Sequence, residues 1–439
     1  MTAVPATDGG PIPDVDAPAV PAGRRRSHGS GFWAVTFAFL VVMAVATLPS
    51  PLYGLYRARD HLSALTITVV FAIFAGSTIA VLQRDSSIVA RIGRRGMMLA
   101  ALATMMVAMG VLATWKDLPG LLIGRVITGV SVGLAAGTAV TYLVELRLRA
   151  DPKASVVRAR TIGTSVTVGA LGVGPLIAGC LAQWVAQPLT VPYLVFVALG
   201  VVALAGLWTA PETGAPAPHA TTTPAPPATT TPAATASAPP AATGNQLAGS
   251  PRKIRLPVPA AAGTLAAFSA NGLFAGLSGL FLATTLHQPS HALSGVALFG
   301  VFAAGVASQL ATARLQASRV LALGTVSMLA GLVLLVVSVR LATPSLALFL
   351  IAGAMIGAGS GAVFKGTSGI VLAASPPQSR VAMTSALLIA LYVGLSVPVI
   401  GAGIALDLGA SAPSTVLGFA ILVGLGVAVS GWALLRRRP

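Results

Sequence analysis

The sequence predicts an all-α membrane protein with twelve transmembrane helices in two six-helix halves that repeat each other. Three observations support this fold class. The 439 residues are 55% hydrophobic and only 8% charged, with a mean hydropathy of +0.88, whereas about a quarter of a soluble chain is charged. Uncharged runs long enough for a transmembrane helix, ~20 residues, recur along the chain. An Ala/Pro/Thr-rich stretch then divides these runs six and six.

The expected spans follow one another in chain order, and none alternates apolar and polar residues as membrane strands do. Each therefore satisfies its backbone hydrogen bonds within a helix. The first six cover roughly 33–52, 65–83, 97–115, 119–143, 161–183 and 191–210. The last six cover roughly 258–283, 293–313, 319–339, 345–373, 381–406 and 415–435.

The placement of basic residues predicts the orientation in the membrane. With the N-terminus in the cytoplasm, 21 of the 27 Lys and Arg fall in cytoplasmic segments, four fall in outer loops, and Arg125 and Lys365 fall within spans. This is the positive-inside bias. It indicates a multi-pass protein of the cell membrane with both termini cytoplasmic and the lipid bilayer as its surroundings. The net charge of +17 thus reflects topology, and nucleic acid is not an expected partner.

The chain divides into four expected segments. A disordered cytoplasmic tail, 1–31, precedes an N-terminal six-helix half, 32–213. A low-complexity cytoplasmic linker, 214–253, joins it to a C-terminal half, 254–439. The linker composition buries no core and is typical of a tether.

The two halves share spaced motifs, which indicates an internal repeat. Gly129, Gly133 and Gly137 match the glycines at 353, 357 and 361 with a constant offset of 224. With an offset of 223, Pro175-Leu-Ile falls on Pro398-Val-Ile. Two six-helix halves of this kind are a transporter architecture whose binding site lies between the halves near the bilayer midplane.

The segment between the second and third spans, 86–95, reads SSIVARIGRR. It is similar to the loop signature of the major facilitator superfamily, in which a glycine and an aspartate precede R-x-G-R-R; Ser86 and Ala90 stand at these two positions. The basic half is present as Arg91, Gly93, Arg94 and Arg95. The resemblance implies a cytoplasmic gating loop whose arginines grip helix ends and carboxylates. Simple positive-inside charges are the alternative.

The fourth span contains a permanent charge within LLIGRVITGVSVGLAAGTAVTYLVEL, residues 121–146. It resembles the superfamily pattern R-x-x-x-G-x-x-x-G through Arg125, Gly129 and Gly133. An intramembrane charge normally faces the bundle interior or a water-filled cavity, and glycines four residues apart admit a neighbouring helix. We therefore expect Arg125 in the substrate pathway. The alternative is a structural arginine bonded to backbone carbonyl groups.

The fifth span contains GALGVGPLIAG, residues 169–179, which resembles the Gly-Pro pattern of the superfamily's antiporters. Proline removes a helix hydrogen bond and glycine permits bending, so a kinked and closely packed helix is expected. Gly174, Pro175 and Gly179 are the residues expected to matter here. A kinked helix without a role in antiport accounts equally well for the same Gly-Pro pattern.

Three further polar residues are candidates for the substrate or ion pathway. Lys365 in the tenth span is the second intramembrane charge, although a lysine there could also extend towards the membrane surface. Asn271 in the seventh span and Tyr392 in the eleventh lie near mid-depth. Either could instead serve in an interhelical hydrogen bond.

The acids and histidines do not include a clear proton carrier. All ten acids and five histidines lie in tails, loops or span ends, whereas proton-coupled carriers usually bury such a group. Coupling would therefore have to use Asp60, Asp407 or Glu145. We expect Glu145 to pair with the arginines between 147 and 160. No phosphate-binding loop, metal cluster or nucleophile–base set stands out, so no enzyme, cofactor or metal site is expected.

The resemblance implies a monomeric secondary transporter that works by alternating access on a small-molecule substrate. Export of small amphipathic organic compounds, with the proton gradient as candidate energy source, is the favoured reading. Uptake of a small anionic metabolite, with Arg125 and Lys365 as counter-charges, is the first alternative. A membrane sensor or scaffold that does not transport is the second.

Overall fold

The computed structural model describes residues 22–151, 154–213, 256–376 and 379–436, and every regular element in these ranges is helical. Eleven of the described helices are long and apolar enough to cross a membrane, and a twelfth, α1, has a shorter apolar part, His28–Ala44. The fold class predicted from the sequence is therefore confirmed. The spanning helices are α1 Ala22–Ala44, α3 Ala64–Leu82, α4 Asp85–Thr114, α5 Leu118–Ala150, α6 Val156–Trp184, α7 Val191–Trp208, α8 Val258–Thr284, α9 His291–Ala311, α10 Ala317–Arg340, α11 Leu346–Ala373, α12 Arg380–Asp407 and α13 Ala412–Arg436.

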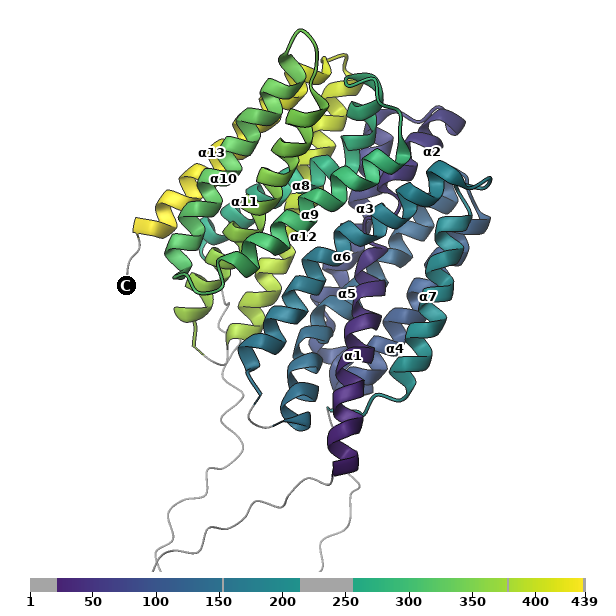
Figure 1. Cartoon of the computed structure of the whole chain (residues 1–439), viewed down its shortest axis with the longest axis vertical. Helices are drawn as coiled ribbons and strands as arrows, with labels where there is room; N and C mark the ends of the chain where they lie inside the picture. Colours follow the sequence, from purple (N-terminus) through teal and green to yellow (C-terminus); the bar gives the residue numbers. More distant parts are fainter. Residues whose placement is uncertain (1–21, 152–153, 214–255, 377–378, 437–439) are drawn as a thin grey trace, which may run out of the picture.

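The helices form two groups that lie side by side, α1–α7 and α8–α13 (Figure 1). Helices α3 and α6 of the first group pack against α12 and α9 of the second. We call the end where α1 begins and α13 ends the proximal end, and the opposite end, which carries the short helix α2 (Tyr53–Asp60), the distal end. The expected tail and linker fall largely outside the described residues, so the domain boundaries stay a prediction.

The glycine repeat corresponds to a repeated helix contact. A side chain on Gly133 of α5 would lie 3.0 Å from the Thr78 carbonyl oxygen of α3, and one on its repeat partner Gly357 of α11 would overlap the Val301 carbonyl oxygen of α9. Both pairs thus cross with their backbones in contact, as small residues at a helix interface allow. Pro175 and Pro398, the other repeated pair, both lie inside helices, α6 and α12.

The first helix differs from the expected span 33–52 at both ends. It begins at Ala22, within the segment predicted to be disordered, and it ends at Ala44. Arginine favours helix, which allows the basic run to continue α1 away from the apolar part. Pro49 and Pro51 explain the early end, because each lacks a backbone N–H. The chain turns there into a 3-10 helix, η1 (Ser50–Leu52), and then into α2.

The predicted loop at 86–95 is also different, because helix α4 already begins at Asp85. Its regularity is broken at Gly93, whose φ of 72° and ψ of 176° are accessible in practice only to glycine. The segment is therefore two helical pieces joined at a glycine bend, with Arg94 at the start of the longer piece.

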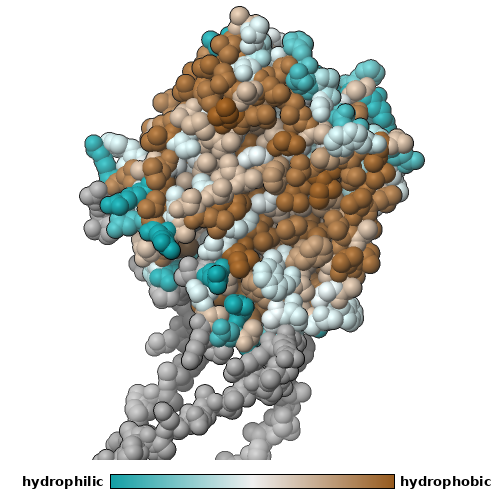
Figure 2. All heavy atoms as spheres, viewed as in Figure 1, coloured by the Kyte–Doolittle hydropathy of each residue, from teal (hydrophilic) through white to brown (hydrophobic). Residues whose placement is uncertain are grey.

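Side-chain exposure fits a molecule surrounded by lipid. Hydrophobic residues cover most of the visible flank, and hydrophilic ones gather towards its upper right and lower left (Figure 2). Four tryptophans lie at or near helix ends and are 47–75% exposed: Trp115, Trp184, Trp208 and Trp432. Exposed tryptophans near the ends of membrane-spanning helices are typical of the membrane–water interface.

Candidate functional site

Arg125 is fully buried between α5 and its neighbours. Its guanidinium donates to the Ala46 carbonyl at 2.8 Å, and more weakly to the carbonyl groups of Val70 at 3.4 Å and Phe71 at 3.5 Å. Its carbon Cζ lies 4.3 Å from the centre of the Phe74 ring, a favourable cation–π distance. These contacts describe a structural arginine bonded to backbone carbonyl groups. Its predicted place in the substrate pathway stays a prediction.

Two glycines bring α5 close enough for this arrangement. A side chain on Gly129 would overlap Phe74 and Ser77 of α3, and one on Gly133 would overlap Val81. Because α3 can approach so closely, its carbonyl groups come within reach of the arginine one turn earlier on α5. The motif R-x-x-x-G-x-x-x-G is thus a single packing unit in this chain.

Asn271 and Tyr392 are both buried near mid-depth, but the structure does not bring them into contact with Arg125. Asn271 donates through Nδ2 to Ser360 Oγ at 3.0 Å, and its Oδ1 has no hydrogen-bond partner among the described residues. The Tyr392 ring meets Phe74 edge-on at 6.1 Å between centroids. This ring pair joins α12 to α3 and therefore links the two helix groups.

Lys365 is half-buried and bonds to the end of α9. Its Nζ donates to the Gln309 carbonyl at 2.6 Å and to the Thr312 hydroxyl at 3.2 Å. A cation is favourable at a helix C-terminus, where carbonyl groups lack partners. Arg125 and Lys365 thus bond to different helices in different groups and do not form a pair.

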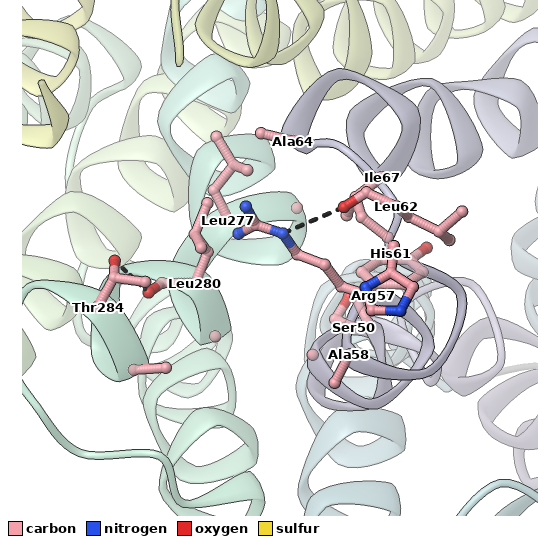
Figure 3. Close-up of a pocket in the computed structure, with 15 residues that line it drawn as sticks. Ser50, Arg57, Ala58, His61, Leu62, Ala64, Ile67, Leu277, Leu280 and Thr284 are labelled. Carbon is pink, nitrogen blue, oxygen red and sulfur yellow. Dashed lines mark hydrogen bonds between the residues drawn. The ribbon is translucent and has the colours of Figure 1, made fainter. Parts of the chain in front are cut away.

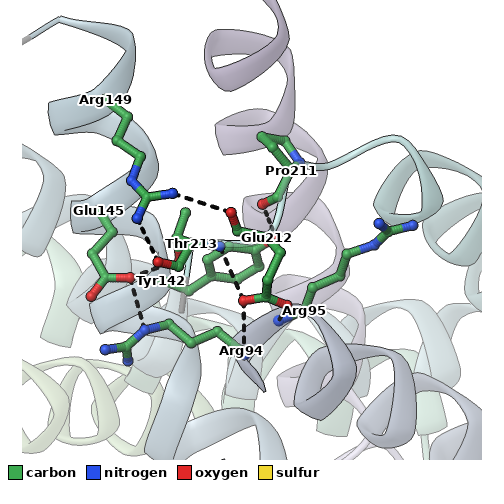
Figure 4. Close-up of polar contacts among 8 residues, drawn as sticks. All are labelled: Arg94, Arg95, Tyr142, Glu145, Arg149, Pro211, Glu212 and Thr213. Carbon is green, nitrogen blue, oxygen red and sulfur yellow. Dashed lines mark hydrogen bonds and ion pairs between the residues drawn. The ribbon is translucent and has the colours of Figure 1, made fainter. Parts of the chain in front are cut away.

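At the proximal end, a polar cluster surrounds the glycine bend of α4 (Figure 4). The Glu212 carboxylate accepts from the backbone N–H groups of Arg94 at 3.1 Å and Arg95 at 3.0 Å. It therefore caps the longer piece of α4, where unpaired N–H groups and the helix dipole favour an anion. A side chain on Gly93 would lie 2.9 Å from this carboxylate, so glycine is required for space as well as for its backbone angles.

The remaining members of this cluster tie α5 to the segment that follows α7. Arg94 Nε pairs with Glu145 at 2.8 Å, and the Thr213 hydroxyl donates to the same carboxylate at 2.7 Å. Arg149 donates to the carbonyl groups of Glu212 and Thr213. Arg95 donates to the Trp208 carbonyl group. Glu145 therefore pairs with Arg94, which the bend at Gly93 brings to it, whereas its expected pairing with the arginines at 147–160 stays a prediction because the Arg160 side chain lies outside the described ones.

Arg91, the remaining member of the predicted gating loop, is exposed. Two acids from elsewhere in the chain, Glu212 and Glu145, bond to the arginines that follow the bend. No local pattern identified Glu212, since it lies 117 residues after Arg95 and reaches it only through the fold. Whether the cluster gates transport stays a prediction.

Glu212→Gln is expected to destabilise the proximal end. The amide NH₂ cannot accept a hydrogen bond, so one of the two N–H groups of Arg94 and Arg95 loses its partner, at a cost of about 1–2 kcal/mol. We expect a lower melting temperature in detergent and faster proteolysis near Gly93. Arg91→Gln, a loss of charge at the exposed arginine before the bend, is the control. Equal melting temperatures for the two variants would show that the cap contributes nothing.

The Gly-Pro segment of α6 packs against the end of α1. Pro175 cannot donate to the Leu171 carbonyl, and the Thr47 hydroxyl donates to that oxygen instead, at 2.5 Å. A side chain on Gly174 would overlap the Ala44 carbonyl oxygen, and one on Gly179 would contact the backbone of His291 and Gly295 in α9. The Gly-Pro segment of α6 therefore packs against a helix of its own group, α1, and against a helix of the other group, α9.

Two hydrogen-bonded seams join the helix groups at the distal end. In the α3–α12 seam, the Asp407 carboxylate at the end of α12 accepts from the N–H groups of Ala64 at 3.0 Å and Leu65 at 3.2 Å. In the α6–α9 seam, Gln183 Oε1 at the end of α6 accepts from the His291 N–H at 3.0 Å and from the Ser290 hydroxyl at 3.2 Å. Gln183 and Asp407 are 224 positions apart, the offset of the internal repeat.

Two cavities lie between the helix groups in the described part of the chain. The distal cavity, of about 460 Å³, lies between η1, α2 and the start of α3 on one side and α8 on the other (Figure 3). The proximal cavity, of about 570 Å³, is a groove largely open at the surface and is lined by α6, by α9 and by Leu40 of α1. Arg125, Asn271, Lys365 and Tyr392 line neither cavity. Within the described part of the chain, no cluster of three or more His, Cys, Asp or Glu could hold a metal ion.

Comparisons with known proteins identify a family and a solved structure that match this chain. No curated protein matches the chain. Among solved structures, a crystal structure of a mutant of the nucleoside transporter NupG has a TM-score of 0.63 and 9% sequence identity, and the alignment covers 93% of this chain and 99% of that one. At this identity, the likeness is evidence of the shared fold alone. The sequence profile described as Major Facilitator Superfamily matches residues 35–316. The chain therefore belongs to the Major Facilitator Superfamily.

Proposed function

We propose that this secondary transporter exports small amphipathic organic compounds across the cell membrane by alternating access, with its proximal end in the cytoplasm. The apolar proximal cavity carries this proposal. Its lining consists almost entirely of apolar side chains from α6 and α9, including Val166, Phe299 and Val306. A cavity of this size, with few polar groups, suits a small ligand with a large apolar part.

The distribution of contacts supports a conformation that receives its cargo from the proximal side. Both hydrogen-bonded seams lie at the distal end, whereas the proximal cavity lies between the proximal halves of α6 and α9. Release at the distal end would then require the seams to separate and the proximal halves to close. Such a cycle is alternating access between two helix groups.

Asp407 is the acid that we propose for proton coupling. It bonds across the two helix groups through its charged carboxylate, whereas Glu145 and Asp60 pair with arginines of their own group, Arg94 and Arg59. Protonation would remove the negative charge that favours the start of α3. A proton taken up from the distal side would therefore weaken the α3–α12 seam and favour its opening.

The two rival functions lose part of their support. Uptake of a small anion was expected to use Arg125 and Lys365 as a pair, and their charged groups bond to backbone carbonyl oxygens in separate helix groups. A sensor without transport is favoured by an incomplete gating loop and by the lack of an acid at mid-membrane, and the contacts of Glu212 with that loop weaken only the first of these reasons. Export therefore remains the function that we favour.

Transport of an amphipathic fluorescent dye into inside-out vesicles tests the proposal. Ala303→Phe should fill the proximal cavity and lower the initial rate about tenfold, the equivalent of about 1.4 kcal/mol of overpacking. Val201→Phe, on the exposed face of α7, should leave the rate unchanged. Accumulation of small anions by right-side-out vesicles would instead favour uptake. Dye binding with no flux would favour the sensor.

A further inference from the structure

The distal cavity has one polar wall and one apolar wall. Ser50, Tyr53 and Arg57 lie three or four residues apart on η1 and α2, so they share one helical face. Opposite them, α8 presents mainly small or apolar side chains, including Leu277 and Leu280. No acidic residue lines the cavity. A molecule bound here would meet hydrogen-bond donors and a positive charge on one side only.

Two hydroxyl groups of the polar wall have no protein partner. Ser50 is 5% exposed and Tyr53 4% exposed, and neither Ser50 Oγ nor Tyr53 Oη makes a hydrogen bond with any described residue. A buried hydroxyl without a partner costs about 1–3 kcal/mol, so native structures rarely retain one without a water or ligand to complete it. Both residues line the cavity, but their two hydroxyl oxygens are shielded from water in this conformation, so a molecule bound in the cavity completes their hydrogen bonds only after the wall rearranges.

Arg57 adds a positioned charge to this wall. Its Nε donates to the Leu62 carbonyl at 3.2 Å, which holds the side chain in place. Figure 3 shows the guanidinium reaching from α2 across to Leu277 of α8. The nearby Asp407 carboxylate is within electrostatic range of Arg57 but bonds to the backbone of α3. The terminal N–H groups of the guanidinium are thus available to a bound anion.

Tyr53 acts as a donor under all physiological conditions. Burial raises the pKa of the Tyr53 hydroxyl, so it keeps its proton. The positive charge of Arg125 acts on the same hydroxyl from behind the wall. The charge of Arg125 favours an anionic acceptor near Tyr53, whereas burial by itself disfavours one.

From these observations we infer that the distal cavity binds the carboxylate group of a small organic acid, with Arg57, Tyr53 and Ser50 as its donors and α8 against its apolar part. A guanidinium matches the planar two-oxygen geometry of a carboxylate. The volume of about 460 Å³ is within the usual range for a small-molecule site. This inference rests on the proposed export function, for which it narrows the cargo to amphipathic acids that pass the site before release.

Three probes with the same apolar body and different head groups test the site: phenylbutyrate, phenylbutylamine and phenylbutanol. Binding to the purified full-length protein in detergent is measured by calorimetry. We expect phenylbutyrate to bind and the amine not to bind, with the alcohol weaker than the acid by about tenfold or more, as a lost charge-assisted hydrogen bond implies. Equal affinity for acid and alcohol would overturn the inference.

Variants on one helix separate the site from general electrostatics. Arg57→Gln should weaken phenylbutyrate binding about tenfold or more, and Tyr53→Phe should weaken it severalfold. Arg59→Gln is the matched control, because Arg59 pairs with Asp60 and Asp117 and does not line the cavity. An equal loss in Arg59→Gln would contradict the assignment. Unchanged melting temperatures confirm that each variant is folded.

The outcomes for site and export can be told apart, because binding is measured without flux. Head-group selectivity and sensitivity to Arg57→Gln, with no dye transport in vesicles, would support the site and contradict export. Dye transport with no preference for the acid would support export and overturn the site.

Discussion

Replacing Arg125 with alanine is expected to lower the stability of the protein by about 3 kcal/mol and to abolish transport. The change removes a charge-assisted hydrogen bond to the Ala46 carbonyl and a desolvated cation–π contact with Phe74, which together account for about this amount. It also leaves a cavity at the point where α1, α3 and α5 meet. Thermal unfolding in detergent, followed by tryptophan fluorescence, measures the loss.

Arg125→Lys is the informative companion variant. A lysine keeps the charge, but its single ammonium group lacks the planar spread with which the guanidinium reaches carbonyl groups on two elements. We expect intermediate stability. If Arg125→Ala unfolded at the temperature of the unsubstituted protein and lost only substrate binding, the pathway role expected from the sequence would hold and the structural role would not.

Gly295→Val is expected to stop turnover while leaving the helix groups folded. A side chain at Gly295 of α9 would overlap the Pro175 carbonyl oxygen of α6. Because these helices belong to different groups, the protein can relieve the overlap by opening the α6–α9 seam. Overpacking costs about 1–3 kcal/mol, enough to shift the balance between the two conformations about tenfold or more and hold the distal end open.

The matched control lies on the same helix. A side chain at Gly300 would meet no atom within 4 Å, so Gly300→Val should transport normally. Opening is measured by labelling a cysteine at Ser294, which is 3% exposed near the seam, in a Cys180→Ser background. We expect faster labelling by an impermeant maleimide in Gly295→Val. Unchanged labelling together with lost transport would mean that the side chain damages α9 itself.

The helices could be predicted from the sequence because membrane insertion leaves a strong one-dimensional signal. Apolar runs of sufficient length predicted the twelve crossings, which correspond to eleven full-length candidate helices and the shorter apolar part of α1 among the described residues. The glycine pattern predicted close helix contacts, and such contacts join α5 to α3 and α11 to α9. The ends were harder. Proline at 49 and 51 stops α1 before the hydrophobic run does, and the helix before Gly93 continues through residues that carry no membrane signal.

The site was less predictable because its groups act through partners distant in the sequence. Arg125 could be identified from the sequence as an intramembrane charge. Its hydrogen-bond acceptors, the carbonyl groups of Ala46 and Phe71, could not be predicted, because both lie far from it in the sequence. Arg57 looked like an ordinary outer-loop charge. Its importance emerges only when the turn at Pro49 and Pro51 aligns Ser50 and Tyr53 with it along one wall, opposite α8.

The two distal seams differ in chemistry although they occupy equivalent places. Gln183 and Asp407 end corresponding helices and offer an oxygen to the first N–H groups of a helix in the other group. One oxygen belongs to a neutral amide and the other to an acid, so salt and acidity act on only one of the two. The molecule therefore has a built-in asymmetry. Its two equivalent seams respond differently to the surrounding medium: acid weakens the α3–α12 seam directly, whereas the α6–α9 seam separates only through the movement of the helices.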